Sequence, residues 1–493
     1  MNVIDQIRER ARTHPDHPAL SVDSAGHGAA GGGSVRHIGY GELVARAEAH
    51  AGRLRDAGLR PGERCGLLAA QGAGFIELAL GILAARACLA PIPDDHRGVV
   101  LEDFVSRSRL HAIVREGDPT PVFERCADDA ATSVRDAIPE EDFRALDPAY
   151  LRFTSGTTRV RKGVLLGHAR IVERLAAANR SLEIGPSDRV LWLLPMAHHF
   201  VVSILLYLQQ GATVLLPSSS LARTVLGFAR REGATVVYAS PHHYGLLAAD
   251  DSELALERVR LAVSTADGLR VDVAERFESR FAVPLTQALG IIEVGLPVIN
   301  RASAAEKPGA LGRPLPDYEV WLRAEDGTPL ATSGPERTGE VCIRGPGMLD
   351  AYLAPWTPAA RVLEPDGFRT GDQGWFDADG DLYLAGRRSN RISMAGMKFF
   401  AEEVEQVLDR HPGIRESRVF ARPHAHLGEI PAAEIVPADP DAAPSRKELV
   451  AHCRGALAAY KVPREFRVVA SLERTSSGKV RRARGAASPA RGA

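Results

Sequence analysis

The chain has 493 residues, of which 45% are hydrophobic and 25% are charged, which is ordinary for a globular protein and long for a single domain. Its 61 Lys and Arg residues nearly balance its 62 Asp and Glu residues, so the net charge of −1 gives no basic field for nucleic acid. Five scattered cysteines without a C-x-x-C pair argue against a disulfide framework or a zinc site, and no apolar run is long enough for membrane insertion. These features predict a cytoplasmic protein of two or more domains.

The beginning of the chain alternates between helical and strand patterns. Helices are predicted at residues 3–11, 40–58 and 75–85, and short buried strands at residues 19–22, 65–68 and 88–92. Strands that alternate with helices of this length favour an α/β fold, with mainly parallel sheets layered with helices.

One stretch, residues 153–163, combines hydroxyls, glycines and cations in a single turn: Phe-Thr-Ser-Gly-Thr-Thr-Arg-Val-Arg-Lys-Gly. Hydroxyls and backbone N–H groups in such a turn can wrap a polyphosphate, and the cations offset its charge. The spacing of a Walker loop is absent. Taken alone, the stretch leaves open a solvated turn rich in Ser, Thr and Gly.

The stretch resembles the phosphate loop of the adenylate-forming superfamily of acyl-CoA synthetases, luciferases and nonribosomal-peptide adenylation domains. That loop typically reads Y/F-T-S-G-T-T-G-x-P-K-G, so Arg159 and Arg161 stand where the family has Gly and Pro. The resemblance implies a catalytic role for Thr154. It also implies that five loop residues bind ATP: Ser155, Gly156, Thr157, Thr158 and Lys162.

Two pairs of histidines follow predicted strands in the middle of the chain. His198, after the strand at 190–194, matches the histidine of a P-x-x-H turn that borders the phosphates and the acyl pocket in the family, so it is a catalytic candidate. The resemblance also implies that His199 and His242 contact the substrate. Without the phosphate loop upstream, histidines at the start of a helix would be structural.

Residues 261–269 resemble the family's S-G-G-A-P-L turn, which flanks the adenine ring, and this makes Ser264 and Asp267 candidate substrate contacts. Residues 287–293 resemble the stretch x-Y-G-x-T/S-E. There Gly290 is a candidate nucleotide contact, and Glu293 is a candidate oxygen ligand of Mg²⁺. Leu289 and Ile292 depart from that pattern, because they replace an aromatic ring and a hydroxyl. The arginines of the phosphate loop could compensate by charge.

The carboxy-terminal part carries three further matches. Asp372 ends the stretch Phe-Arg-Thr-Gly-Asp, and the resemblance implies that it accepts hydrogen bonds from the ribose hydroxyls. Arg387 lies in a stretch that resembles the hinge of the family and would contact ribose or phosphate. Residues 472–481 resemble the stretch L-P-x-T-x-S-G-K-I/V-x-R. Its lysine is Lys479, which would stabilise the charge that develops in the transition state of adenylation.

The resemblance implies two domains. A large amino-terminal domain, residues 1–385, would bind ATP and the acid. A small mobile α+β domain, residues 386–493, would carry Lys479, with a hinge near residues 387–390. Rotation of the small domain would follow adenylation.

The implied reaction is the attack of a carboxylate on the α-phosphorus of MgATP, which releases pyrophosphate and leaves an acyl-adenylate. A thiol of CoA, or of the phosphopantetheine arm of a carrier protein acting in trans, then accepts the acyl group. The histidines favour a small, aryl or polar acid. Two alternatives stay open: a nitrite-activating diazotase that acts on an aryl amine, and a catalytically weakened nucleotide-binding regulatory protein, which the departures at Arg159, Arg161, Leu289 and Ile292 would explain.

Overall fold

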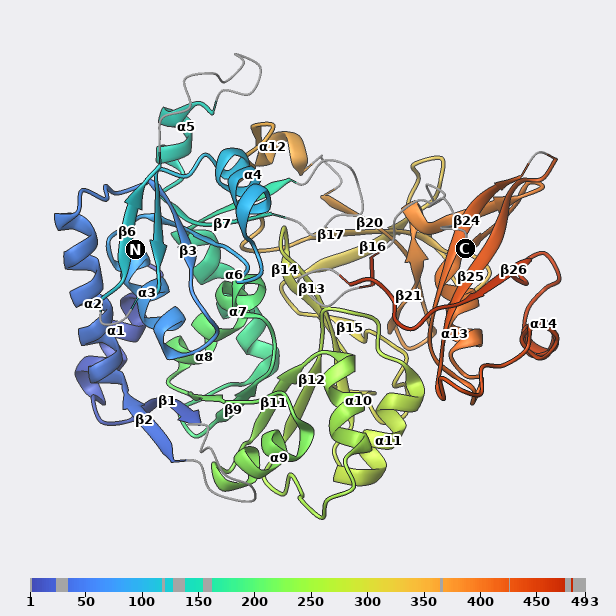
Figure 1. The fold of residues 1–493 in the computed structure, drawn as a ribbon. Helices are drawn as coiled ribbons and strands as arrows, with labels where there is room; N and C mark the ends of the chain where they lie inside the picture. The colour runs from blue at the N-terminus through green and yellow to red at the C-terminus, as the bar shows by residue number, and fades with distance from the viewer. Residues whose placement is uncertain are drawn as a thin grey trace. The chain divides into compact units, whose positions relative to one another are not determined.

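The computed structural model describes residues 2–23, 34–117, 120–126, 138–153, 162–363, 367–424, 426–474 and 480–481. These residues form two compact units, coloured along the chain in Figure 1. The first unit contains residues up to 319 together with 343–368, and the second contains 320–342 and the residues from 369 onward. Within the described ranges, no helix is both long and apolar enough to cross a membrane.

The first unit contains a nine-stranded sheet in the order β15-β14-β13-β12-β11-β9-β10-β1-β2. Its strands are β1 (Pro18–Asp23), β2 (Val35–Gly39), β9 (Arg189–Trp192), β10 (Thr213–Leu216), β11 (Val236–Ala239), β12 (Leu261–Ser264), β13 (Leu285–Ile291), β14 (Gly295–Ile299) and β15 (Arg313–Pro314). All neighbouring pairs from β1 to β13 are parallel, whereas β2, β14 and β15 pair antiparallel at the two edges. The parallel strands are apolar along almost their whole length because helices cover both faces.

An eight-stranded sheet in the same unit has the order β19-β18-β8-β7-β4-β3-β5-β6. Its strands are β3 (Arg64–Leu68), β4 (Cys88–Pro91), β5 (Ala112–Arg115), β6 (Val122–Arg125), β7 (Pro148–Phe153), β8 (Gly163–Gly167), β18 (Ala351–Tyr352) and β19 (Thr357–Pro358). The antiparallel pair β7–β8 brings Phe153 opposite Gly163. The two ends of the predicted phosphate loop therefore lie on neighbouring strands.

The helices of the first unit are α1 (Asp5–Thr13), α2 (Tyr40–Asp56), α3 (Ala73–Ala84), α4 (Gly98–Ser108), α5 (Glu140–Ala145), α6 (His168–Leu182), α7 (Met196–His199), α8 (Leu205–Gln210), α9 (Ala222–Arg231), α10 (Pro241–Ala249), α11 (Val271–Phe281) and α12 (Ala359–Val362). A π-helical turn, Phe200–Ile204, joins α7 to α8. Such turns are rare and recur at functional sites.

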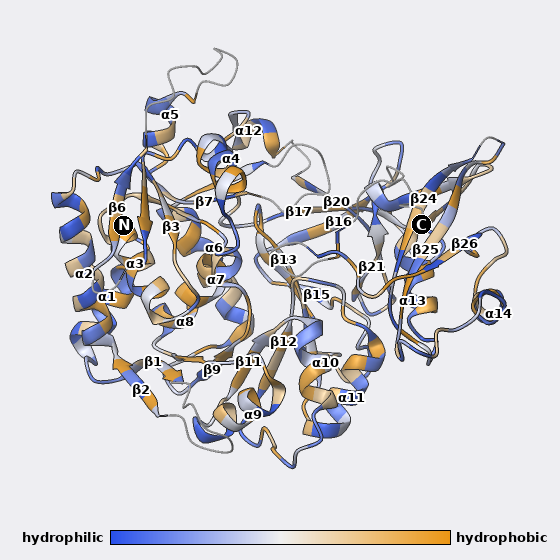
Figure 2. Ribbon diagram, viewed as in Figure 1, coloured by the Kyte–Doolittle hydropathy of each residue, from blue (hydrophilic) through white to orange (hydrophobic). Residues whose placement is uncertain are grey.

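The two faces of the nine-stranded sheet are covered by different helices. Leu191, Leu215 and Val237 pack in one core with residues of α9, α10 and α11. Because side chains alternate along a strand, Trp192 and Tyr238 point to the opposite face, where both contact the ring of Tyr207 on α8. Figure 2 shows the apolar strands inside this unit and the polar outer surface of helices such as α2.

The second unit contains most of a four-stranded sheet in the order β16-β17-β20-β21. These strands are β16 (Glu319–Arg323), β17 (Gly339–Arg344), β20 (Phe368–Phe376) and β21 (Leu382–Arg387). A five-stranded sheet follows, with β22 (Arg391–Met394), β23 (Met397–Phe400), β24 (Ile414–His424), β25 (Gly428–Pro437) and β26 (Glu465–Val468), and with helices α13 (Ala401–Leu408) and α14 (Arg446–Ala456).

The sequence prediction of an α/β fold is confirmed: the large unit has one mainly parallel sheet and one mixed sheet, and the smaller unit has mixed α and β structure. Helix α14 shows how local sequence places these elements. The Ser445 hydroxyl accepts the Glu448 N–H at 3.3 Å, and the Glu448 carboxylate accepts the Ser445 N–H at 2.7 Å. This capping box satisfies backbone donors that the first turn of the helix leaves open.

Candidate nucleotide-binding site

Six residues of the predicted site lie outside the described ranges: Thr154, Ser155, Gly156, Thr157, Thr158 and Lys479. The off-pattern residues Arg159 and Arg161 lie outside them as well. Lys162, the last cation of the phosphate loop, is described and exposed. Its Nζ lies 4.5 Å from the centroid of the Tyr352 ring, within the range of a cation–π contact. Just before β8, the ammonium group of Lys162 therefore packs against the ring of Tyr352 on β18.

Tyr352 connects this cation to the predicted metal ligand. Its hydroxyl donates a hydrogen bond of 3.0 Å to Oε1 of Glu293, and both side chains are buried. Burial, followed by the negative charge of Glu293, raises the pKa of Tyr352 well above its usual range, so the hydroxyl stays a donor. The other carboxylate oxygen of Glu293 is an anionic oxygen of the type that Mg²⁺ prefers.

Arg174 on α6 holds the backbone around Glu293, and the sequence analysis did not identify it. The side chain is only 2% exposed, and burial lowers its pKa to about 10. Its guanidinium donates to the carbonyl of Ile292 at 2.9 Å and to the carbonyl of Gly347 at 2.8 Å. A Cβ added at Gly347 would lie 2.6 Å from the Arg174 backbone nitrogen, so the two segments approach as closely as glycine allows. A lone Arg on an amphipathic helix carries no sequence signal for this role.

His198 and His199 end α7, just before the π-helical turn. Arg152, the residue before Phe153 at the end of β7, donates from Nη1 to the carbonyl of His198. The Nε of Arg152 is buried and has no hydrogen-bond partner among the described residues, and burial lowers the pKa of this guanidinium while Glu293 opposes the shift. Arg152 is thus a second cation of the site that the sequence analysis missed. His199 is buried, and its ring contacts Trp192.

His242 lies on the first turn of α10 and is exposed, whereas its neighbour His243 is partly buried. The two rings are 5.9 Å apart. Burial, and then the nearby His242, lowers the pKa of His243 to about 4, so His243 is neutral at physiological pH. Its Nδ1 lies 2.8 Å from the hydroxyl of Ser240.

Strand β12 ends in the predicted adenine-flanking turn. Ser264 is fully buried, and its Oγ has no hydrogen-bond partner in the described parts of the chain. Ala266 has φ of +76°, a left-handed conformation that explains why the family has glycine there. Asp267 is exposed, and its carboxylate accepts the N–H of Gly268 at 3.0 Å. Gly290 is exposed on β13, close in sequence to Glu293.

The second unit brings Asp372 and Arg387 together. They are paired residues of β20 and β21, and Nε of Arg387 donates to Oδ1 of Asp372 at 2.8 Å. Asp372 is buried and Arg387 is about half exposed. The Phe-Arg-Thr-Gly-Asp stretch lies in strand β20, where Gly371 adopts φ of +75°. Within the described ranges, the second carboxylate oxygen of Asp372 and further guanidinium N–H groups of Arg387 stay available to a polar ligand.

The residues present fit a magnesium nucleotide. Glu293 offers the acidic oxygen that the metal requires, and Lys162 and Arg152 supply positive charge in the same unit. The buried and unpartnered Nε of Arg152 and Oγ of Ser264 are polar atoms of the kind that a bound ligand satisfies. The fold and these groups define a nucleotide-binding α/β enzyme.

Comparison with known proteins identifies the family. Residues 7–353 match the family model described as AMP-binding enzyme, and residues 403–479 match that of the AMP-binding enzyme C-terminal domain. Sulfoacetate–CoA ligase of Cupriavidus necator is 30% identical over 97% of this chain and 96% of its own length. Feruloyl-CoA synthase of an Amycolatopsis species is 28% identical, over 91% of this chain and 94% of its own length.

Among solved structures, o-succinylbenzoate CoA synthetase of Bacillus subtilis, in complex with an acyl-adenylate intermediate, superposes with a TM-score of 0.82. It is 23% identical, with 97% of each chain covered, and so it supports the fold. The chain belongs to the AMP-binding enzyme family. The prediction of an ATP-dependent, AMP-forming ligase of the adenylate-forming superfamily is confirmed.

Proposed function

We propose that this enzyme activates a small aryl or polar carboxylic acid as an acyl-adenylate and passes the acyl group to the thiol of CoA. The observation that carries the proposal is the buried Glu293 carboxylate, which accepts a hydrogen bond of 3.0 Å from the Tyr352 hydroxyl. The ring of the same tyrosine contacts the Lys162 ammonium group. Such a fixed oxygen next to phosphate-binding charge is what adenylation of a carboxylate needs. The relatives named as CoA ligases support a thiol acceptor. They do not support the nitrite-activating diazotase or the regulatory protein.

Glu293 would hold Mg²⁺, which supplies charge neutralisation at the phosphates of ATP. Lys162 and Arg152 would offset the remaining negative charge, together with the hydroxyls and N–H groups of the phosphate loop. We assign the ribose to the Asp372–Arg387 pair, because a buried carboxylate accepts two hydroxyl protons well. We assign the adenine ring and the acid to the segments of Ser264, Asp267, Gly290, His198, His199 and His242.

A small domain from residue 386 onward would carry Lys479 to the reacting carboxylate. The short 3₁₀ turn Arg388–Asn390, between β21 and β22, supports a hinge near residues 387–390 because one turn of backbone can absorb a change in φ and ψ. The ammonium of Lys479 would stabilise the charge that develops as the carboxylate oxygen attacks the α-phosphorus. A carrier protein acting in trans is the alternative source of the thiol.

The test is pyrophosphate release from MgATP across benzoates, cinnamates, short fatty acids, amino acids, and nitrite with an aryl amine. Each positive acid is then offered CoA, a phosphopantetheinylated carrier or an amine. We expect release with one class of carboxylic acid and AMP formation accelerated by CoA. Pyrophosphate release with nitrite and the aryl amine alone would indicate a diazotase. No pyrophosphate release with any acid, while ATP still binds, would refute the proposed ligase activity.

A further inference from the structure

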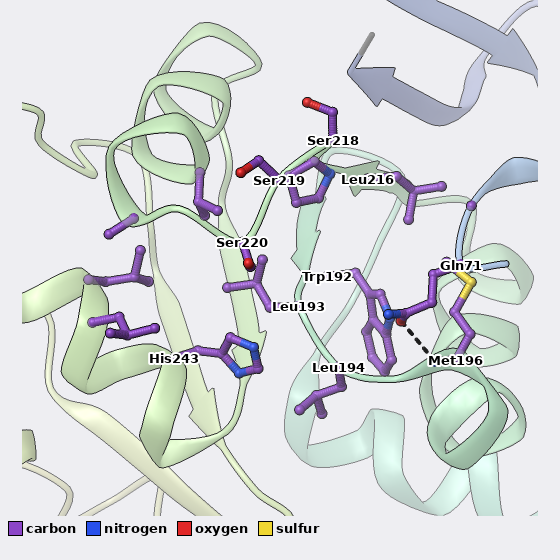
Figure 3. A pocket seen from close by; sticks show the side chains of 16 residues that line it. Gln71, Trp192, Leu193, Leu194, Met196, Leu216, Ser218, Ser219, Ser220 and His243 are labelled. Atoms are coloured by element: carbon purple, nitrogen blue, oxygen red, sulfur yellow. Dashed lines mark hydrogen bonds between the residues drawn. The ribbon is translucent and has the colours of Figure 1, made fainter. Parts of the chain in front are cut away.

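A pocket opens in the first unit at the carboxyl ends of β9, β10 and β11 (Figure 3). The chain leaves β9 towards α8 on one face of the sheet, whereas it leaves β10 and β11 into α9 and α10 on the opposite face. Neighbouring strands therefore send their connections to opposite faces, and open α/β sheets bind ligands at such a switch point. We call this crevice the switch-point pocket. Its volume is about 270 Å³.

The switch-point pocket is uncharged. None of the 16 residues that line it carries a charged side chain at neutral pH, because the only titratable one, His243, has its pKa lowered to about 4 by burial. Its lining is polar and apolar in about equal parts, and the aliphatic side chains come from the strand ends and from α7, α9 and α10: Leu193, Leu194, Met196, Leu216, Val225 and Leu247. A second carboxylate or a sulfonate would be buried there without a cation, which is strongly unfavourable.

Several polar atoms around the switch-point pocket already have partners. The Ser218 hydroxyl donates to a carboxylate at 2.7 Å, Ser219 Oγ accepts a backbone N–H at 3.1 Å, and Gln71 Oε1 accepts the Met196 N–H at 3.2 Å, drawn as a dashed line in Figure 3. Trp192 is different. It is 3% exposed, and its indole Nε1 has no acceptor among the described residues. A buried N–H donor without a partner points to an acceptor on a ligand.

The switch-point pocket adjoins the reaction site through shared elements. Met196 lines the pocket and begins α7, which also carries His198. On the other side, the rings of Trp192 and His199 are in contact, with centroids 6.2 Å apart. A ligand group in this pocket would therefore contact Met196 and Trp192, which are the neighbours of the two histidines proposed to contact the acid.

We propose that the switch-point pocket receives the uncharged ring of an aromatic acid and that an oxygen substituent on the ring accepts the Trp192 indole N–H. The inference rests on the proposed function and deepens it, because it selects aryl acids with a phenol, ether or carbonyl oxygen over small diacids. An apolar cavity of about 150 Å³ holds one benzene molecule, so the pocket suits a ring with one or two small substituents. Leu246, which is 42% exposed, forms an apolar rim.

The test compares kcat/KM for pyrophosphate release with 4-hydroxybenzoate and benzoate, with 4-hydroxycinnamate and cinnamate, and with oxalate. We expect wild type to favour a hydroxylated acid by at least about tenfold over its unsubstituted partner and to be inactive with oxalate. Trp192→Phe should reduce that preference to less than about threefold. Leu246→Trp should lower kcat/KM for the best aryl acid by at least about tenfold. The control is Val271→Trp, at an exposed position at the start of α11 that does not line the pocket, and it should leave kcat/KM unchanged.

The midpoint of thermal unfolding of each variant distinguishes a loss of activity caused by misfolding from one caused by the larger side chain in the pocket. If wild type turns over an acid but Leu246→Trp behaves like Val271→Trp and Trp192→Phe keeps the substrate preference, the pocket does not hold the acid, although the proposed function stands. Preference for oxalate would overturn the inference in the same way. If no acid releases pyrophosphate, the proposed function and this inference fail together.

Discussion

The hydrogen bond from Tyr352 to Glu293 offers the sharpest test of the candidate site, because it can be removed by deleting one oxygen. Both side chains are buried, the two atoms are 3.0 Å apart, and the partners are 59 residues apart in sequence. A hydrogen bond to a charged group contributes about 1.5–3 kcal/mol, against about 0.5–1.5 kcal/mol for a neutral one. Tyr352→Phe should therefore lower the free energy of unfolding by about 1.5–3 kcal/mol.

Two controls isolate the charged bond. In a Glu293→Gln background the same change should remove only about 0.5–1.5 kcal/mol, because the acceptor is then neutral. Tyr318→Phe, which removes a buried hydroxyl that bonds only carbonyls at 3.2 and 3.4 Å, should also stay in that lower range. Urea denaturation at constant m-value measures all five proteins: wild type, the three single variants and the double variant. Equal losses from Tyr352→Phe in both backgrounds would contradict the charged hydrogen bond.

The same variant tests the link from structure to reaction. Groups that orient a metal ligand typically contribute about 10–100-fold to metal affinity or activity. Tyr352→Phe should raise the Mg²⁺ concentration at half-maximal pyrophosphate release within that range, while Tyr318→Phe should not. An unchanged Mg²⁺ dependence in Tyr352→Phe would show that the Tyr352 hydroxyl does not orient a metal ligand.

The remaining predictions concern catalysis, packing and pH. Lys479→Ala should lower the rate of adenylation by about 10²–10³ without changing the urea midpoint, and adenylate formation at the wild-type rate would refute its role. Arg174→Met removes the donor from the buried carbonyl of Gly347 and the part-buried carbonyl of Ile292, so it should lower the free energy of unfolding by at least about 1–3 kcal/mol. A loss below about 1 kcal/mol would show that water replaces the guanidinium. Burial holds the pKa of His243 and of His168 at about 4, below the unfolded value of 6.5, so their contribution is complete above pH 6.5 and is lost as pH falls towards 4. Urea midpoints at pH 7 and pH 5 should therefore differ less in His243→Gln and His168→Gln than in wild type.

Local sequence was sufficient wherever the physical cause is local. The patterns at residues 40–58 and 75–85 predict helices, and those at 65–68 and 88–92 predict strands, that the structure contains with ends within a residue or two. The π-helical turn after α7 is an element that the sequence analysis did not predict.

The sequence by itself determined which residues could do chemistry: a turn dense in hydroxyls and cations, and the acids at positions 293 and 372, in an order that matches one superfamily. Only the tertiary structure decided how they are held. Three features are made of residues far apart in sequence. They are the contact of Lys162 with the Tyr352 ring, the hydrogen bonds from Arg174 to two backbone carbonyls, and the uncharged pocket at the ends of β9, β10 and β11. Such contacts depend on strand order and on which face each connection takes, and no local pattern of side chains encodes either.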